Sequence, residues 1–110
     1  MLIVLSAEVL KHIHDIVIKQ RGEPGYMSEG MVQGCIERAI TNVYDFQPFP
    51  TVIRKAAAFL YSMIIFHPFI DGNKRTALIG TYWLLYLNGY SFRIPKDAVA
   101  FLRAIADLKV

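Results

Sequence analysis

Apolar residues recur at every third or fourth position through most of the chain, which is the spacing of an amphipathic helix. Ser6 is a good N-cap residue, so we predict that the first helix begins just after it. Residues 21–26, RGEPGY, contain two glycines and a proline and predict a loop. A second helix then follows Ser28 and runs to about residue 42. The residues expected to face inward are Val9, Leu10, Ile13, Ile16 and Val17 on the first helix, and Met31, Cys35, Ile36 and Ile40 on the second.

Two further segments are apolar on nearly all sides, which predicts helices in the middle of a bundle. One runs from about Thr51 to Phe66, and the other runs from about Asn73 to about residue 88, where Gly89 is a typical stop. Two prolines favour an extended connection over residues 44–51, and a proline at position 95 suits the first turn of a last helix through about residue 108. The sequence therefore predicts a single all-α domain, residues 1–110, with a polar segment that joins the two central helices.

The bulk composition argues against several classes of protein. Hydrophobic residues make up 55% of the chain and charged residues 19%, so we do not expect a disordered protein. The net charge is only +3 and the basic residues are scattered, so we expect no direct binding of nucleic acid. No signal-peptide pattern is present, and the longest apolar run, residues 56–66, is shorter than the roughly 20 residues that cross a bilayer. We therefore expect a cytoplasmic protein without membrane contact. The high mean hydropathy of +0.36 indicates either an unusually apolar core or apolar surface that a partner covers.

The polar segment HPFIDGNKR, residues 67–75, lies between the two central helices and carries the candidate chemistry. Pro68 disfavours helical geometry at His67, so the third helix should end there. Gly72 allows a tight turn, and either it or Asp71 should cap the next helix. The segment is therefore expected to be a short loop followed by the first turn of the fourth helix.

The charges in that first turn are unusual for a helix. Lys74 and Arg75 face the positive end of the helix dipole, at a cost of about 0.3–1 kcal/mol each. A bound anion would remove this conflict, because the free N–H groups of a helix start and two cations together suit a phosphate. Asn73 could add its amide, Asp71 could hold a divalent cation, and His67 could act as a general base. These groups suffice for phosphate binding and for the transfer of a phosphate-bearing group.

The segment HPFIDGNKRTA resembles the central motif of the Fic/Doc superfamily, H-x-F-x-[DE]-G-N-G-R-x-x-R, and specifically its Doc (death-on-curing) branch. Lys74 replaces the second glycine of the general motif and Leu78 replaces its second arginine, as is usual in Doc proteins. The segments LSAEVLKHIHD, SEGMVQGCIERA, RKAAAFLY and LNGYSF also look similar to Doc proteins. The resemblance implies an all-α Fic/Doc bundle of about five to six helices, with the motif loop between two central helices.

The resemblance further implies the toxin of a toxin–antitoxin pair. Doc proteins are protein kinases that transfer the γ-phosphate of ATP to a Ser/Thr hydroxyl of a translation factor, elongation factor Tu or its equivalent, and so inhibit translation. Fic enzymes with the full motif transfer AMP instead, and Lys74 and Leu78 favour phosphate transfer. An AMP transferase and a catalytically silent binding module stay open as alternatives. The sequence shows no inhibitory helix of its own, so the resemblance implies an antitoxin whose C-terminal helix docks in a groove.

The residue roles implied by the resemblance fall within the motif. His67 would be the catalytic base, Asp71 would hold Mg²⁺, and Phe69 would anchor the loop. Residues 45–51, DFQPFPT, correspond to the flap along which the target chain aligns. The residues implied to bind the phosphates of ATP are Gly72, Asn73, Lys74 and Arg75.

Several other reactive or aromatic residues are more simply explained by structure. Cys35 is expected to be a buried small hydrophobe rather than a nucleophile. His12 and His14 stand two apart on a helix and point to different faces, so they make a poor metal pair and are expected at the solvated surface. The aromatic residues at helical spacing in the fourth helix are expected to pack in the core, with the alternative that one of them lines the nucleotide pocket; they are Tyr82, Trp83 and Tyr86.

Overall fold

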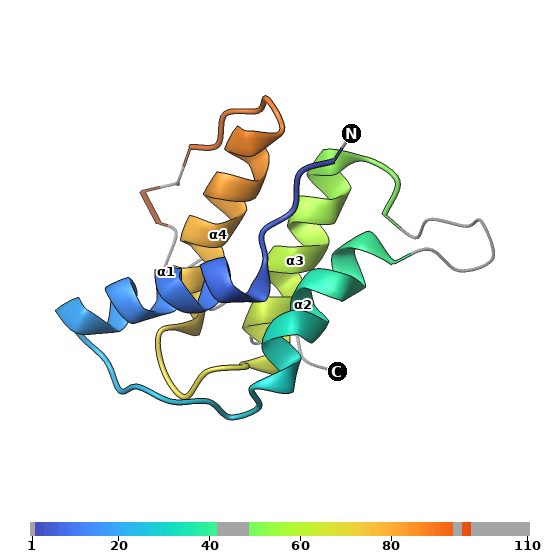
Figure 1. The fold of residues 1–110 in the computed structure, drawn as a ribbon. Helices are drawn as coiled ribbons and strands as arrows, with labels where there is room; N and C mark the ends of the chain where they lie inside the picture. Colours follow the sequence, from blue (N-terminus) through green and yellow to red (C-terminus); the bar gives the residue numbers. More distant parts are fainter. Residues whose placement is uncertain (1, 42–48, 94–95, 98–110) are drawn as a thin grey trace.

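The computed structural model describes residues 2–41, 49–93 and 96–97, and these ranges contain four helices (Figure 1). They are α1 (Ala7–Gln20), α2 (Gly30–Ile40), α3 (Val52–Phe66) and α4 (Asn73–Leu87). The all-α prediction is confirmed, but the described part of the chain holds four helices rather than five to six. Most of the predicted last helix and most of the predicted flap lie outside the described residues. Among the described segments the closest approach to a strand is a single antiparallel bridge between Tyr26 and Phe69.

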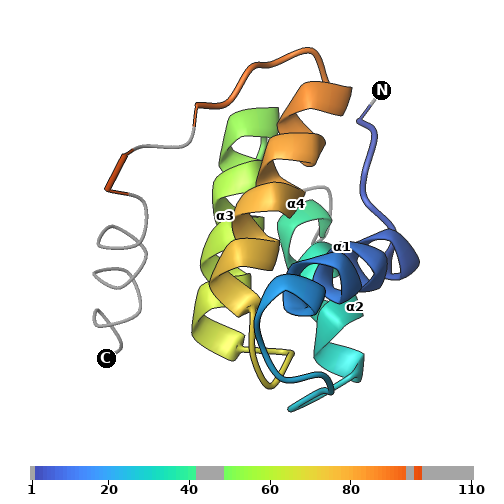
Figure 2. The ribbon, with the colours of Figure 1, turned by 90° about the vertical axis from the view of Figure 1, so that its left-hand side faces the viewer.

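The helices α3 and α4 form an antiparallel hairpin at the centre of the molecule, joined by the motif loop, residues 67–72 (Figures 1 and 2). Helix α1 crosses α4 and packs on it, while α2 packs mainly on α3 and more lightly on α1. The motif loop thus lies at one end of the hairpin, next to the segment that links α1 to α2. The prediction of a polar loop between two central helices is confirmed.

The ends of the helices follow the residues that predicted them. The hydroxyl of Ser6 accepts a hydrogen bond of 3.1 Å from the N–H of Val9 at the start of α1. Beyond the end of α4, Gly89 has a φ of 88°, a left-handed conformation that glycine adopts without strain. The chain reversal at this glycine lets the N–H of Tyr90 donate to the carbonyl of Leu85 at 2.9 Å. This pattern ends the helix where the sequence predicted it to end.

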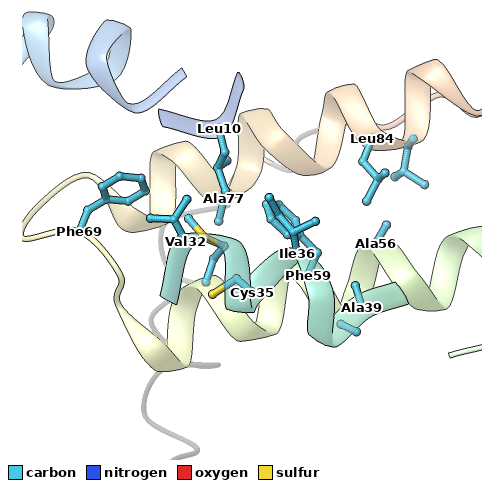
Figure 3. Close-up of a cluster of buried hydrophobic side chains, with 13 residues drawn as sticks. Leu10, Val32, Cys35, Ile36, Ala39, Ala56, Phe59, Phe69, Ala77 and Leu84 are labelled. Carbon is cyan, nitrogen blue, oxygen red and sulfur yellow. The ribbon is translucent and has the colours of Figure 1, made fainter. Parts of the chain in front are cut away.

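The core lies between the central hairpin and the two flanking helices (Figure 3). Helices α1, α3 and α4 approach one another closely at Gly80, where a Cβ atom would lie 3.1 Å from the Phe59 ring and 3.3 Å from Leu10. Phe69 is fully buried in the same cluster, and burial of a side chain of this size contributes about 1.5–3 kcal/mol. The loop is therefore anchored in the core. The buried members of the cluster are Leu10, Val32, Cys35, Ile36, Ala39, Ala56, Ala58, Phe59, Met63, Phe69, Ala77, Leu84 and Leu85.

The single cysteine behaves as predicted. Cys35 is fully buried in the core, and this burial raises the pKa of its thiol to about 11. The thiol is therefore protonated and shielded at neutral pH, so its role is that of a small hydrophobe.

The outer face of α4 differs from the prediction. Tyr82, Trp83 and Tyr86 do not pack in the core, because 36%, 42% and 56% of their surfaces are exposed. Their rings contact one another instead, with Trp83 edge-on to both tyrosines at centroid distances of 5.5 and 5.6 Å. On α1, likewise, Val9 and Ile16 are 45% and 49% exposed rather than inward-facing. None of the helices in the described ranges combines the length and the apolarity needed to cross a membrane.

Candidate functional site

The motif loop begins with a strained residue. His67 caps the C-terminus of α3 with φ 46° and ψ 64°, and its N–H donates to the carbonyl of Met63 at 3.2 Å. Within the described residues it is the one non-glycine residue with positive φ, a conformation that costs roughly 1–2 kcal/mol. Because Pro68 excludes the right-handed helical region, the helix ends here as the sequence predicted. The surrounding structure must therefore hold His67 in place.

The segment between α1 and α2 supplies much of that support through its main chain. The carbonyl of Pro68 accepts hydrogen bonds from the N–H groups of Met27 at 2.9 Å and Ser28 at 3.1 Å. The N–H of Ile70 donates to the carbonyl of Gly25 at 3.1 Å. These bonds pair the motif loop with residues 25–28 over a short antiparallel stretch. The loop is thus fixed by a second loop that is distant in sequence.

Asn73 holds the motif loop from inside. Its side-chain oxygen accepts the N–H of Phe69 at 3.0 Å, and its side-chain nitrogen donates to the carbonyl of Phe69 at 2.8 Å. The side chain is only 8% exposed. The amide that was expected to contact phosphate is therefore engaged with the loop, which leaves the main-chain N–H of Asn73 as its group for an anion.

Asp71 is a carboxylate held in place by two main-chain donors. One oxygen accepts the N–H of Gly72 at 2.8 Å and the other accepts the N–H of Glu23 at 3.1 Å. These bonds, that of Glu23 first, hold the pKa of Asp71 below its ordinary value, and the nearby Arg75 and Arg21 act in the same direction. Asp71 is therefore ionised at neutral pH, as a ligand for a cation must be.

The first turn of α4 has the features of an anion site. Gly72 is its N-cap, with φ 78° and ψ 12°, and no side chain caps the helix. The first main-chain bond of the helix runs from the N–H of Thr76 to the carbonyl of Gly72 at 2.9 Å, so the three N–H groups before Thr76 lack partners within the helix. Lys74 stands among them, half-buried, and makes no hydrogen bond or ion pair with any described residue. Uncapped N–H groups and an unpaired cation suit an anion.

Arg75 differs from Lys74 because it is already engaged. Its guanidinium donates to the carbonyl of Val17 at 3.3 Å, in the last turn of α1. A cation is favourable at that end of a helix dipole. Arg75 also lies beside Gly22, where a Cβ atom would be 3.2 Å from the guanidinium and 3.0 Å from the carboxylate of Asp71. Because Gly22 has no side chain, the carboxylate of Asp71 and the guanidinium of Arg75 can both lie next to it.

His14 does not lie at the solvated surface, where the sequence predicted it. This residue is 3% exposed rather than solvated, and its ring stacks on Phe69 at a centroid distance of 3.7 Å and an interplanar angle of 7°. Its Nε2 lies 2.7 Å from the carbonyl oxygen of Asp71. The signal that could have found it is helical spacing, because position 14 falls on the same face as Leu10 and Val17. His12 is exposed, as predicted.

The site thus joins an ionised carboxylate, an uncapped helix start, an unpaired lysine and a histidine. No group of three histidine, cysteine, aspartate or glutamate side chains that could hold a metal gathers in the described part of the chain. A single carboxylate such as that of Asp71 is compatible with Mg²⁺. This ion usually keeps several waters and takes one or two carboxylates together with the phosphates of its substrate. The residues present therefore fit a phosphate ligand that carries its own divalent cation.

An all-helical fold with this loop between its central helices defines the class of the protein. A model of the family described as the Fic/DOC family matches residues 4–85, so the chain belongs to that family.

One relative to which the chain is similar is a toxin. Toxin Doc of Mycolicibacterium smegmatis (strain ATCC 700084 / mc(2)155) is 35% identical over 76 residues, which make up 69% of this chain and 58% of that relative. The chain thus spans less than two thirds of the length of the curated relative that it matches. No solved structure matches the chain. These findings confirm the resemblance to the Doc branch of the family.

Proposed function

We propose that this chain is a Doc-like toxin that acts as an ATP-dependent protein kinase in the cytoplasm. It transfers the γ-phosphate of ATP to a Ser/Thr hydroxyl of a translation factor, elongation factor Tu or its equivalent, and so inhibits translation. The observation that carries the proposal is Lys74, an unpaired cation among the described residues in the uncapped first turn of α4. Its position is that of the second glycine in the Fic motif that accompanies AMP transfer.

The phosphates of ATP bind to the first turn of α4 in this proposal. The main-chain N–H groups of Asn73, Lys74 and Arg75 donate to phosphate oxygens, and the ammonium of Lys74 neutralises their charge. Anion binding also offsets the unfavourable interaction of Lys74 with the helix dipole. Arg75 adds positive charge while its guanidinium stays bonded to Val17.

Asp71 would hold Mg²⁺, which when bound would offset the negative charge of the phosphates. The support for this role is the lowered pKa of Asp71, because a carboxylate that stays ionised is available to a cation. Each carboxylate oxygen accepts one main-chain N–H and keeps a further lone pair for the metal.

His67 takes the proton of the target hydroxyl. As the hydroxyl oxygen forms a bond to the γ-phosphorus, the bond from that phosphorus to the β–γ bridging oxygen breaks and ADP leaves. The hydrogen bond from the His67 N–H to Met63, and the neighbouring bonds of Pro68, support a fixed backbone from which the imidazole acts.

Control of such a toxin requires a partner. We propose an antitoxin that docks a C-terminal helix in a groove of this chain, because the protein to which the chain is similar is a toxin. The exposed aromatic residues of α4 support the presence of a partner, since a contiguous apolar patch is often an interaction surface.

The test is to incubate the protein with elongation factor Tu, Mg²⁺ and ATP labelled at either the γ- or the α-phosphate. We expect label on the elongation factor from γ-labelled ATP alone, and we expect that His67→Ala removes it. Label from the α position would show an AMP transferase instead. Absence of transfer from both, together with normal growth of cells that express the protein, would indicate a silent binding module.

A further inference from the structure

His14 lies outside the motif, yet it contacts the motif loop at two places. Its ring stacks on Phe69 and its Nε2 is 2.7 Å from the carbonyl oxygen of Asp71. A carbonyl oxygen can only accept a hydrogen bond, so the imidazole carries its proton on Nε2. With 3% of its surface exposed, His14 is a buried donor aimed at the main chain of the loop.

The hydrogen bond from His14 to the carbonyl of Asp71 constrains the whole peptide unit between Asp71 and Gly72. The peptide unit between Asp71 and Gly72 is trans and planar, so its C=O and N–H groups point in opposite directions and move together. The N–H of this unit donates to the carboxylate of Asp71 at 2.8 Å. Holding the carbonyl therefore also orients the N–H, and through it the carboxylate.

The same face of α1 encloses the turn that follows. A Cβ atom on Gly72 would lie 3.3 Å from Ile18, 3.4 Å from Val17 and 3.5 Å from His14. These contacts leave little room for the backbone at Gly72 to shift toward α1. The start of α4 is thus enclosed by α1 on one side, and His14 is the member of that face that also makes a directional bond.

We propose that His14 is a positioning residue for the site. Its Nε2–H sets the orientation of the peptide between Asp71 and Gly72, and hence the position of the Asp71 carboxylate and of the first turn of α4. It touches neither the nucleotide nor the target protein. The expected effect of His14 on kcat rests on the proposed phosphate transfer. Its effect on the orientation of the peptide between Asp71 and Gly72 does not.

Two substitutions separate the hydrogen bond from the ring. His14→Gln keeps an N–H donor at the approximate place of Nε2 but loses the stack on Phe69, whereas His14→Phe keeps a stacking ring but loses the donor. His12→Phe, on the exposed side of the same helix, is the matched control. The measurements are kcat and KM for ATP in γ-phosphate transfer to elongation factor Tu, with thermal unfolding of each variant.

We expect kcat to fall about tenfold in His14→Phe, with a smaller loss in His14→Gln and none in His12→Phe. The melting temperature should be higher in His14→Phe than in His14→Gln, because the phenylalanine preserves the buried stack on Phe69 and the glutamine does not. If His14→Phe keeps full kcat, or if His14→Gln is the slower enzyme, the hydrogen bond has no positioning role and the proposal is wrong.

Failure of the proposed function looks different, because the unsubstituted protein itself would then transfer no γ-phosphate. The positioning role is then tested by NMR of the histidine ring nitrogens and by amide hydrogen exchange. The proposal requires a proton on Nε2 of His14 and faster exchange of the Gly72 N–H in His14→Phe than in His12→Phe. Absence of either result would overturn it.

Discussion

Two asparagines at the two ends of α4 use their side-chain amides in the same way for different purposes. Asn73, in the first turn, binds both main-chain groups of Phe69, four residues earlier, at 3.0 and 2.8 Å. Asn88, the C-cap, binds both main-chain groups of Ile3, 85 residues earlier, at 2.8 and 2.7 Å. We call each such pair of hydrogen bonds a clasp. The clasp of Asn73 is buried and closes the motif loop, whereas the clasp of Asn88 is exposed and binds the N-terminal segment to the end of α4.

The difference shows how the site end of the helix is made rigid. There a local clasp is reinforced from outside by α1 and by residues 23–28, so the loop keeps a strained His67 and an uncapped helix start. At the other end the helix terminates at Gly89, and the side chain of Asn88 makes one pair of bonds with Ile3, which is distant in sequence. We therefore expect loss of the Asn73 bonds at the site end to affect both transfer and stability, and loss of the Asn88 bonds at the far end to affect stability alone.

The largest effect on activity is expected at His67. His67→Asn should reduce phosphate transfer by a factor of about 10²–10⁴, because the general base is lost. Asparagine tolerates the left-handed backbone conformation that this position requires, so the substitution should add no backbone strain and the protein should still fold. Steady-state transfer assays and thermal unfolding check both expectations. A variant that transfers phosphate at the normal rate would remove His67 from the reaction.

Loss of the buried clasp should give the largest effect on stability. Asn73→Ala leaves the N–H and C=O of Phe69 without partners in a buried position, which costs about 2–4 kcal/mol in the free energy of unfolding. Transfer should fall as well, because the loop loses its fixed shape. Urea-induced unfolding measures the loss. A cost no greater than that of Asn88→Ala would contradict the difference between the two clasps.

Lys74 should show opposite effects on function and stability. Lys74→Met should raise KM for ATP about tenfold, because a cation is lost from the phosphate site. It should also stabilise the free protein by about 0.3–1 kcal/mol at low salt, because a cation no longer faces the positive end of the helix dipole. Kinetics and urea unfolding of the same preparation test the pair of effects. A destabilised variant would mean that Lys74 has a structural partner.

Asp71 should give stability a dependence on pH. Its pKa in the folded protein lies below the ordinary value of 3.8, so the ionised carboxylate stabilises the fold above about that pH. This contribution disappears as the pH falls through the folded pKa. The difference in unfolding free energy between the unsubstituted protein and Asp71→Asn should therefore shrink as the pH is lowered below 3.8. Urea unfolding over a pH series measures it, and a constant difference would contradict the assigned cause.

The smallest effect on phosphate transfer is expected at the far end of α4. Asn88→Ala should cost about 1 kcal/mol, because the bonds to Ile3 are exposed and water can replace them. Hydrogen exchange at the N–H of Ile3 should become faster, while phosphate transfer stays unchanged. Reduced transfer in this variant would show that the two ends of the helix are not independent.

The same contrast explains what could be predicted from the sequence. The motif loop and the first turn of α4 depend on local rules, namely Pro68 after His67, the glycine at 72 and cations at a helix start. The stop at Gly89 depends on such a rule too. Phe69 was expected to anchor the loop, and it does so through burial that local hydrophobicity indicates.

Long-range contacts could not be predicted in this way. The clasp of Asn88 on Ile3 and the bond of Glu23 to Asp71 join residues whose separation in sequence carries no spacing rule. His14 was misplaced because a polar residue was assigned to the surface by type, although its position matched the buried face of α1. The aromatic residues of α4 were misplaced for the converse reason, since large apolar side chains were assigned to the core.

The central claim is that the site end of α4 directs a phosphate, rather than a nucleotide, to the target. The most direct test is the intact mass of elongation factor Tu after incubation with the protein, Mg²⁺ and unlabelled ATP. The account predicts a gain of one phosphoryl group, absent with His67→Asn. A gain of one adenylyl group would contradict it.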